Sequence, residues 1–292
     1  MRQAGVSFER MAGVLRGAPI ETLTAPADLQ LRGTLPALPE APRTAAGRLE
    51  RLEVRGLTFR YPGSENGVFD VDLDIARGSF TVVTGRIGSG KTTLLRALLG
   101  LVKMDAGEMK WNGMVVDEPD RFFVPPHAAY TPQVPKLFSM TLRDNLLMGL
   151  AVSDDELLAA IDTAVMTPDL AHMVAGLGTQ VGPQGVRLSG GQVQRTAAAR
   201  MLVRKPDLLV FDDLSSALDV ETEGRLWDGL LRKHADTTSL VVSHRHPALR
   251  RADQIVVMVG GRVESVGTLD ELLVKSPELQ RLWVGGNAGG VP

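Results

Sequence analysis

The segment GRIGSGKT, from Gly85 to Thr92, has the spacing of a phosphate-binding loop, with a strand-like run before it and a helix-like run after it. Glycines in such a loop let successive backbone N–H groups point at an anion, and the start of the following helix adds partial positive charge. Lys91 is placed to reach the outer phosphates of a nucleotide, and the Thr92 hydroxyl is placed to bind Mg²⁺. We expect nucleotide contacts from Gly85, Arg86, Ile87, Gly88, Ser89, Gly90, Lys91, Thr92 and Thr93.

A second helix start in the same chain also has the composition of an anion site. In LSGGQVQR, from Leu188 to Arg195, a serine and two glycines open a helix. One chain would therefore carry two half-sites for phosphate. The alternative interpretation is a serine-capped helix with a glycine-rich start and no ligand.

Together these motifs resemble the ATP-binding cassette (ABC) family, whose signature motif is LSGGQ, over roughly residues 49 to 275. The resemblance implies a P-loop NTPase (RecA-like) α/β core with an antiparallel β subdomain and an inserted α-helical subdomain. It also implies that two domains dimerise head to tail, so that the signature of one contacts the nucleotide held by the other. The signature residues are Ser189, Gly190, Gly191 and Gln192. Alternating strand-like and helix-like segments independently indicate an α/β sheet with a helical insertion.

Four single positions also match the family's nucleotide site, and each has a plain structural alternative. The resemblance implies that Tyr61 stacks on adenine and that Gln133 meets Mg²⁺ or water, whereas alone they would indicate a packed strand-end tyrosine and a turn. It implies that His244 contacts the γ-phosphate, whereas alone it would indicate a surface residue, which is what we expect of the neighbouring His246. It places Asp219 along the dimer interface, a role compatible with capping the helix that follows.

The stretch LLVFDDLSSALD, residues 208–219, runs an apolar strand into two adjacent acids, Asp212 and Asp213. In the family the first acid helps to hold Mg²⁺, and the second is normally a glutamate that polarises the attacking water. Asp213 is one methylene shorter, so its carboxylate would lie about 1 Å or more from that position, which can cost on the order of 10²-fold in rate. We expect slow hydrolysis, either in a half-degenerate subunit paired with a different chain or in a homodimer with altered geometry.

Two segments shift the expectation towards exporters. TQVGPQG, from Thr179 to Gly185, resembles the exporter X-loop TEVGERG, which contacts the transmembrane domains, but Gln180 and the pair Pro183 and Gln184 replace its charged residues. Residues 7–11, SFERM, resemble the segment where an exporter's last transmembrane helix enters its nucleotide-binding domain. An amphipathic N-terminal helix is the alternative for that segment.

Composition argues against several other classes of function. Lys and Arg (32) nearly balance Asp and Glu (34), so no nucleic-acid footprint is visible, and the lack of cysteine excludes disulfides and suits a reducing compartment. No apolar run approaches the roughly 18 residues of a membrane span, and no signal peptide is evident, so we expect a soluble chain. We divide it into an N-terminal helix and linker (1–47), a nucleotide-binding domain (48–283, helical subdomain about 135–200) and a flexible tail (284–292).

The sequence therefore predicts a MgATP-dependent ATPase domain at the cytoplasmic face of the cell membrane. Its expected partners are a second nucleotide-binding domain and transmembrane permease domains, without nucleic acid. The expected catalytic residues are Lys91, Gln133, Asp213 and His244, and the expected metal ligands are Thr92, Gln133 and Asp212. The alternatives are a soluble ABC ATPase acting on nucleic acid or ribosomes, and an importer-type ATPase.

Overall fold

A computed structural model describes residues 47–182, 187–233 and 236–286, all of them within one unit, residues 41–292. The predicted N-terminal helix and linker and the resemblance at residues 7–11 lie outside the described residues, as does the part of the X-loop that follows Gly182. The boundaries that we drew between domains stay predictions. Within the described ranges no helix is long and apolar enough to cross a membrane.

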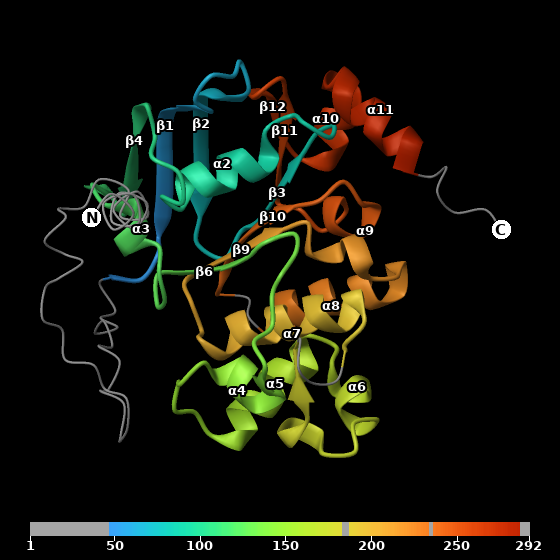
Figure 1. The fold of residues 1–292 in the computed structure, drawn as a ribbon. Coiled ribbons are helices and arrows are strands. Elements are labelled where there is room, and N and C mark those ends of the chain that lie inside the picture. Colours follow the sequence, from blue (N-terminus) through green and yellow to red (C-terminus); the bar gives the residue numbers. More distant parts are fainter. Residues whose placement is uncertain (1–46, 183–186, 234–235, 287–292) are drawn as a thin grey trace, which may run out of the picture. The chain divides into compact units, whose positions relative to one another are not determined.

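The centre of the fold is a largely parallel sheet in which the strand carrying the phosphate-binding loop lies between two other strands (Figure 1). Its order is β12 (Arg262–Gly267), β11 (Gln254–Val259), β3 (Phe80–Thr84), β10 (Thr238–Val242), β9 (Leu208–Asp212) and β6 (Ala128–Thr131). Only β12 runs antiparallel to its neighbour among these described strands. Because the other strands are parallel, the segments that follow their carboxyl ends meet at one edge of the sheet.

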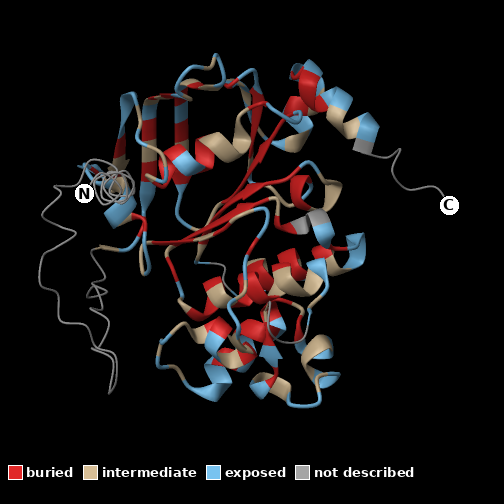
Figure 2. Cartoon of the chain, in the orientation of Figure 1, coloured by how far each residue is buried: buried red, intermediate tan, exposed pale blue. Residues whose placement is uncertain are grey.

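Both faces of this sheet are covered, which explains its continuous apolar strands. Every residue of β3, β9 and β10 is buried (Figure 2). Side chains alternate between two cores, so that Val82 packs with the helical side and Val83 packs with the antiparallel sheet. The helix that follows the phosphate-binding loop, α2 (Lys91–Leu98), contributes Leu94 and Leu98 to the second core.

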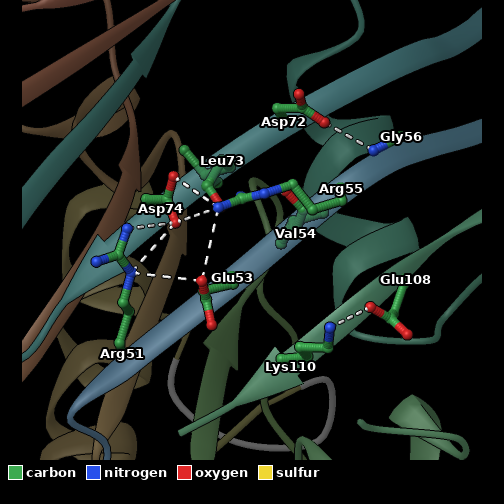
Figure 3. Close-up of polar contacts among 10 residues, drawn as sticks. All are labelled: Arg51, Glu53, Val54, Arg55, Gly56, Asp72, Leu73, Asp74, Glu108 and Lys110. Atoms are coloured by element: carbon green, nitrogen blue, oxygen red, sulfur yellow. Dashed lines mark hydrogen bonds and ion pairs between the residues drawn. The ribbon is translucent and has the colours of Figure 1, made fainter. Parts of the chain in front are cut away.

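An antiparallel sheet covers the other side of α2, in the order β2 (Gly67–Ala76), β1 (Arg51–Arg60), β4 (Ala106–Trp111) and β5 (Met114–Val115). Apolar side chains of β1 face the core, while charged ones form ion pairs across the outer surface (Figure 3). Arg51 and Arg55 both approach Asp74 Oδ1 to 2.9 Å, and Lys110 approaches Glu108 to 2.7 Å. Such exposed pairs typically contribute only about 0–1 kcal/mol each, so burial of the inner face stabilises this sheet.

The predicted helical insertion lies between β6 and β9. It contains α4 (Leu142–Leu147), α5 (Asp154–Thr163), α6 (Thr167–Ala171), a short 3₁₀ turn η4 (Gly176–Gly178) and α7 (Gly190–Val203). Ser153 caps α5 with a full capping box. A two-stranded ladder of β7 (Met140–Thr141) and β8 (Gln180–Val181) was not predicted. The connection from β5 to β6 contains α3 (Pro119–Phe122).

The C-terminal third alternates helices with the last strands of the main sheet. After η5 (Leu214–Ala217) come α8 (Val220–Lys233), α9 (His246–Leu249), α10 (Leu269–Lys275) and α11 (Pro277–Gly286). The run QIVVMVGGRV is part of a hairpin of β11 and β12. Gly260 and Gly261 form its turn with φ of 54° and 79°, a backbone region that favours glycine.

Candidate functional site

A cavity of about 550 Å³ opens beside the start of α2, a volume that suits a small-molecule ligand. It is lined from the loop and helix by Gly88, Gly90, Lys91, Thr92 and Thr93, and from the surrounding strands and their turns by Tyr61, Glu65, Asn66, Gly67, Phe69, Gly260 and Gly261. Of the predicted loop residues, Arg86, Ile87 and Ser89 line an adjacent cavity of about 260 Å³, and Gly85 lines neither.

The loop backbone has the conformation of a phosphate cradle. Gly85, Gly88 and Gly90 have φ of 144°, 81° and 99°, and a Cβ at Gly85 would lie 2.3 Å from the carbonyl oxygen of Met258. No described side chain caps α2 at Gly90, and its first turn carries no acid. The first N–H groups of α2 are therefore available to an anion.

Lys91 lies folded against this loop. Its Nζ donates hydrogen bonds to the carbonyl oxygens of Gly85 at 2.7 Å and Arg86 at 2.8 Å. Burial lowers the pKa of Lys91, and the nearby carboxylates of Asp213 and Asp212 oppose that shift. The ammonium group is thus fixed within the loop, where the phosphates of a bound nucleotide would lie.

Asp212 and Thr92 meet at the carboxyl end of β9. Thr92 Oγ1 donates to Asp212 Oδ1 at 2.9 Å, and Tyr130 OH donates to Asp212 Oδ2 at 3.3 Å. Asp212 is only 1% exposed, and burial raises its pKa. Both hydroxyl partners are neutral, and the positive charge of Arg96 opposes the shift without cancelling the effect of burial. A carboxylate and a hydroxyl together are oxygen ligands that fit Mg²⁺.

We expect Asp212→Asn to raise the melting temperature (Tm) of the nucleotide-free protein at pH 7. The pKa of the Asp212 carboxyl in the folded state lies above its unfolded value of about 3.9. The folded state therefore loses stability as pH rises from the unfolded pKa through the folded-state pKa, and it regains that stability below the unfolded pKa. The gain should therefore vanish near the unfolded pKa. Each kcal/mol gained would appear as roughly 2–4 °C in Tm for a domain of this size.

Calorimetric scans at pH 7 and pH 4 check this, with Asp117→Asn as a control because Asp117 is an exposed acid. A lower Tm for Asp212→Asn than for the wild type at pH 7 would mean that the carboxylate stabilises the fold, contrary to the expectation.

Asp213 follows directly, and one of its oxygens has no partner. Gln133 Nε2 donates to Asp213 Oδ2 at 3.1 Å, while Oδ1 is buried without a hydrogen bond among the described residues. Burial raises the pKa of Asp213 despite the opposing charge of His244. Its backbone is left-handed, with φ of 52°, which aspartate tolerates better than most residues. An unpartnered buried oxygen is a place for a water molecule or an ion.

His244 lies at the same edge of the sheet as the two acids. Val242, at the end of β10, is paired with Asp212, and Asp213 N donates to the carbonyl oxygen of Val242 at 3.1 Å. His244 follows two residues later and is exposed. The structure thus brings Gln133, Asp213 and His244 to one edge of the sheet.

The signature segment does not join this cavity. Ser189 caps α7, where its Oγ accepts from Gln192 N at 3.3 Å and its N–H donates to Gln192 Oε1 at 2.9 Å. A Cβ at Gly191 would lie 2.8 Å from the carbonyl oxygen of Ala217, so this position requires glycine. Ser189 and Gly190 are exposed, and no signature residue lines the cavity.

Asp219 acts as a helix cap in this structure. Its carboxylate accepts hydrogen bonds from Thr222 N at 2.8 Å and Thr222 Oγ1 at 2.7 Å at the start of α8. This is the structural alternative that the sequence left open beside an interface role. The side chain is exposed and does not line the cavity.

Six cavity residues, Glu65, Asn66, Gly67, Phe69, Gly260 and Gly261, were not predicted from the sequence, and the prediction for one histidine was wrong. The guanidinium groups of Arg60 and Arg262 lie near the ring of Phe69, and Gly261 approaches the same ring from the turn after β11. In the sequence, the adjacent glycines Gly260 and Gly261 were the signal that the backbone of this turn approaches another segment closely. His246, expected at the surface, is half-buried and stacks on Trp283 with ring centroids 4.0 Å apart.

Comparisons with known proteins identify the family of this chain. Residues 68–216 match the family described as "ABC transporter". An ATP-dependent lipid A-core flippase of Pseudomonas fluorescens is 37% identical over 235 residues, which are 80% of this chain and 39% of that protein. A probable multidrug resistance ABC transporter ATP-binding/permease protein of Bacillus subtilis is 34% identical over 222 residues, 75% of this chain and 38% of that protein.

Among solved structures, a bacterial Atm1-family ABC exporter with ATP bound matches with a TM-score of 0.77 and 26% identity, over 94% of this chain and 48% of that one. The chain thus spans less than half the length of these relatives. The likeness confirms the predicted P-loop NTPase core with its antiparallel β subdomain and helical insertion. The chain belongs to the ABC transporter family and carries that family's ATP-binding, ATP-hydrolysing domain.

Proposed function

We propose that this chain is the nucleotide-binding part of an exporter-type ABC transporter, on the cytoplasmic side of a membrane, and that it powers transport by MgATP-driven dimerisation and hydrolysis. The relatives named above, a lipid flippase, a multidrug transporter and an exporter, support the exporter type. They give no support to a nucleic-acid-binding or importer-type ATPase, and we do not retain those alternatives.

The separation of the two phosphate half-sites carries the proposal. The cavity holds Lys91 and Thr92 but no signature residue, while Ser189 and Gly190 are exposed at the start of α7. An exposed, glycine-rich helix start that is not used by the chain's own cavity suits the nucleotide of a second domain. Each nucleotide would then lie between the loop of one domain and the signature of the other.

The proposed roles follow from the contacts at the end of β9. Thr92 and Asp212 would hold Mg²⁺, which neutralises charge on the phosphates when bound. Lys91 would replace its contacts to loop carbonyls by contacts to phosphate oxygens. Asp213, with one unpartnered oxygen, would accept a hydrogen bond from the attacking water, while Gln133 holds its other oxygen and His244 faces the γ-phosphate.

The segment after Gln133 is our candidate for contact with the transmembrane domains. Val134 and Phe138 are apolar side chains exposed by 65% and 50%. The segment adjoins the short ladder that contains Gln180, because Phe138 and Met140 lead into β7. Exposed apolar residues next to the predicted X-loop support a docking surface for a permease partner.

Dimerisation tests the proposal, and Ser189 allows a matched pair of variants. In an Asp213→Asn background, which slows hydrolysis, MgATP is expected to convert the chain from monomer to dimer in sedimentation velocity, and ADP is not. Adding Ser189→Asp should abolish the dimer, because an acid there retains the helix cap but repels the partner's phosphates. Adding Ser189→Asn, a neutral cap, should preserve it.

ATP affinity measured at low protein concentration should be the same in both variants, because Ser189 does not line the chain's own cavity. A chain that stays monomeric with MgATP would contradict self-association and leave only a partner of different sequence. Equal dimerisation of the two Ser189 variants would remove the signature from the interface.

A further inference from the structure

The C-terminal helix α11 contacts the phosphate-binding loop through a buried acid. Glu278 is 4% exposed, and its Oε1 lies 2.7 Å from Nε of Arg86, the second residue of the loop. Arg281, one turn further along α11, lies 3.6 Å from Glu278 Oε2. The contact with Arg86 is an ion pair that lacks the alignment of a hydrogen bond. A charge on the last helix thus reaches the loop that forms the phosphate cradle.

The same helix contacts the segment that follows His244. The imidazole of His246 stacks on Trp283 with centroids 4.0 Å apart and an interplanar angle of 27°. Its Nε2 lies 3.1 Å from the carbonyl oxygen of Trp283, so this nitrogen carries the proton and donates it. The guanidinium of Arg250 lies 5.6 Å from the same indole ring. Trp283 therefore fixes the start of α9 from outside the sheet.

These two contact points belong to loops that leave neighbouring strands. Val83 of β3 is paired with Val242 of β10, and Arg86 and His244 follow the ends of those strands by two residues each. On the other side, Arg245 Nη1 donates to the carbonyl oxygen of Leu218 at 2.7 Å, which ties the histidine segment to the residues after the two acids. The distance between the phosphate-binding loop and His244 therefore depends on the contacts that fix each of these two loops.

We propose that α11 is a positioning element of the nucleotide site, in which Glu278 fixes the phosphate-binding loop and Trp283 fixes the His244 segment. The inference rests on the proposed function, because it assigns residues that set the geometry of the same ATP site. Neither Glu278 nor Trp283 lines the 550 Å³ cavity beside α2, and they act through Arg86 and His246. The helix couples the two loops, so a change in one contact alters the spacing at the γ-phosphate.

Packing alone does not explain why an acidic residue, Glu278, occupies this buried position of α11. The apolar anchor of α11 is Leu279, which is fully buried, whereas Glu278 places a carboxylate in the interior beside a backbone that must bind phosphate. Buried ion pairs generally stabilise a fold no better than apolar residues of similar size. The pair does give a defined position to Arg86, whose side chain is otherwise 61% exposed.

Trp283→Ala in the full chain tests the contact with the histidine segment. The single-turnover rate at saturating MgATP should fall about tenfold, as expected for a misplacement of well under the 1 Å that costs about 10²-fold. The dissociation constant for ATP should stay within about twofold. Trp283→Phe keeps a ring for stacking and should restore the rate, and Val284→Ala, at a position 73% exposed on the same helix, is the matched control. A rate equal to that of the control would overturn the inference.

Glu278→Gln tests the contact with the phosphate-binding loop, because the two possible roles of the acid predict opposite changes in ATP affinity. If the acid positions Arg86, ATP affinity should fall about tenfold, an effect typical of one charge-assisted contact. If Glu278 instead acted only as a negative charge near the phosphates, its removal would raise affinity, and that outcome would contradict a positioning role.

Hydrogen exchange without nucleotide separates this inference from the proposed function. Backbone amides of residues 86–92 in Glu278→Gln, and of residues 243–249 in Trp283→Ala, should exchange faster than in Val284→Ala, whereas the amides of β9 should not change. Unchanged exchange in both segments would refute the positioning role even in a chain that hydrolyses ATP. Faster exchange in a chain that binds no ATP would support it and refute the proposed function.

Discussion

Replacing Lys91 by alanine is expected to weaken ATP binding by about 10- to 100-fold, the loss expected for hydrogen bonds from a charged donor. The Lys91 ammonium is already fixed in the loop by the carbonyl oxygens of Gly85 and Arg86, and the loop glycines Gly85, Gly88 and Gly90 have positive φ values. The substitution should thus remove the charge from a cradle that keeps its shape. Isothermal titration calorimetry with MgATP measures the change.

Lys103→Ala is the matched control, because Lys103 is an exposed lysine away from the cavity. It should bind MgATP as the wild type does. Wild-type affinity in Lys91→Ala would remove the assignment of residues 85–93 as the phosphate-binding loop.

Lengthening the second acid, Asp213→Glu, is expected to speed single-turnover hydrolysis by about tenfold or more, within the roughly 10²-fold range of a 1 Å correction in placement. Asp213 Oδ1 is buried and accepts no hydrogen bond from the described residues, whereas Gln133 Nε2 donates to Oδ2. One more methylene extends the free oxygen further from the strand end towards the site of the γ-phosphate. Rapid quench with enzyme in excess over MgATP measures the step.

Two further readouts make this prediction specific. Asp213→Asn, equal in size but without the charge, should lower the rate, whereas nucleotide affinity should be similar in both variants. The left-handed backbone at position 213, with φ of 52°, suits aspartate better than glutamate, so Asp213→Glu should also lose a little thermal stability. A lower rate in Asp213→Glu with unchanged binding would show that the shorter acid is properly placed.

Local patterns were enough to predict most of the main sheet and the cradle. β3, β9 and β10 appear in the sequence as continuous apolar runs because both of their faces are buried. The glycine spacing of residues 85–92 predicts the loop because its conformation depends on positive φ values at Gly88 and Gly90. The meeting of Thr92 with Asp212 follows once the strands are parallel and adjacent to the helix start.

Contacts between distant segments could not be predicted in this way. Phe69 lines the cavity because β2 lies against the turn at Gly261, a proximity of two sheets that neither segment encodes alone. His246 is half-buried because α11, more than 30 residues later, brings Trp283 against it. The ladder of β7 and β8 is too short, at two residues per strand, to give a period-two pattern.

A crystal structure of this chain with Mg²⁺ and a non-hydrolysable ATP analogue tests the central claim most directly. We predict the triphosphate on residues 85–93 with Lys91 turned to its oxygens, the adenine against Tyr61, and the metal between Thr92 Oγ1 and Asp212, whose present hydrogen bond of 2.9 Å would open. A nucleotide bound elsewhere, or a metal that leaves the Thr92–Asp212 bond intact, would contradict the account.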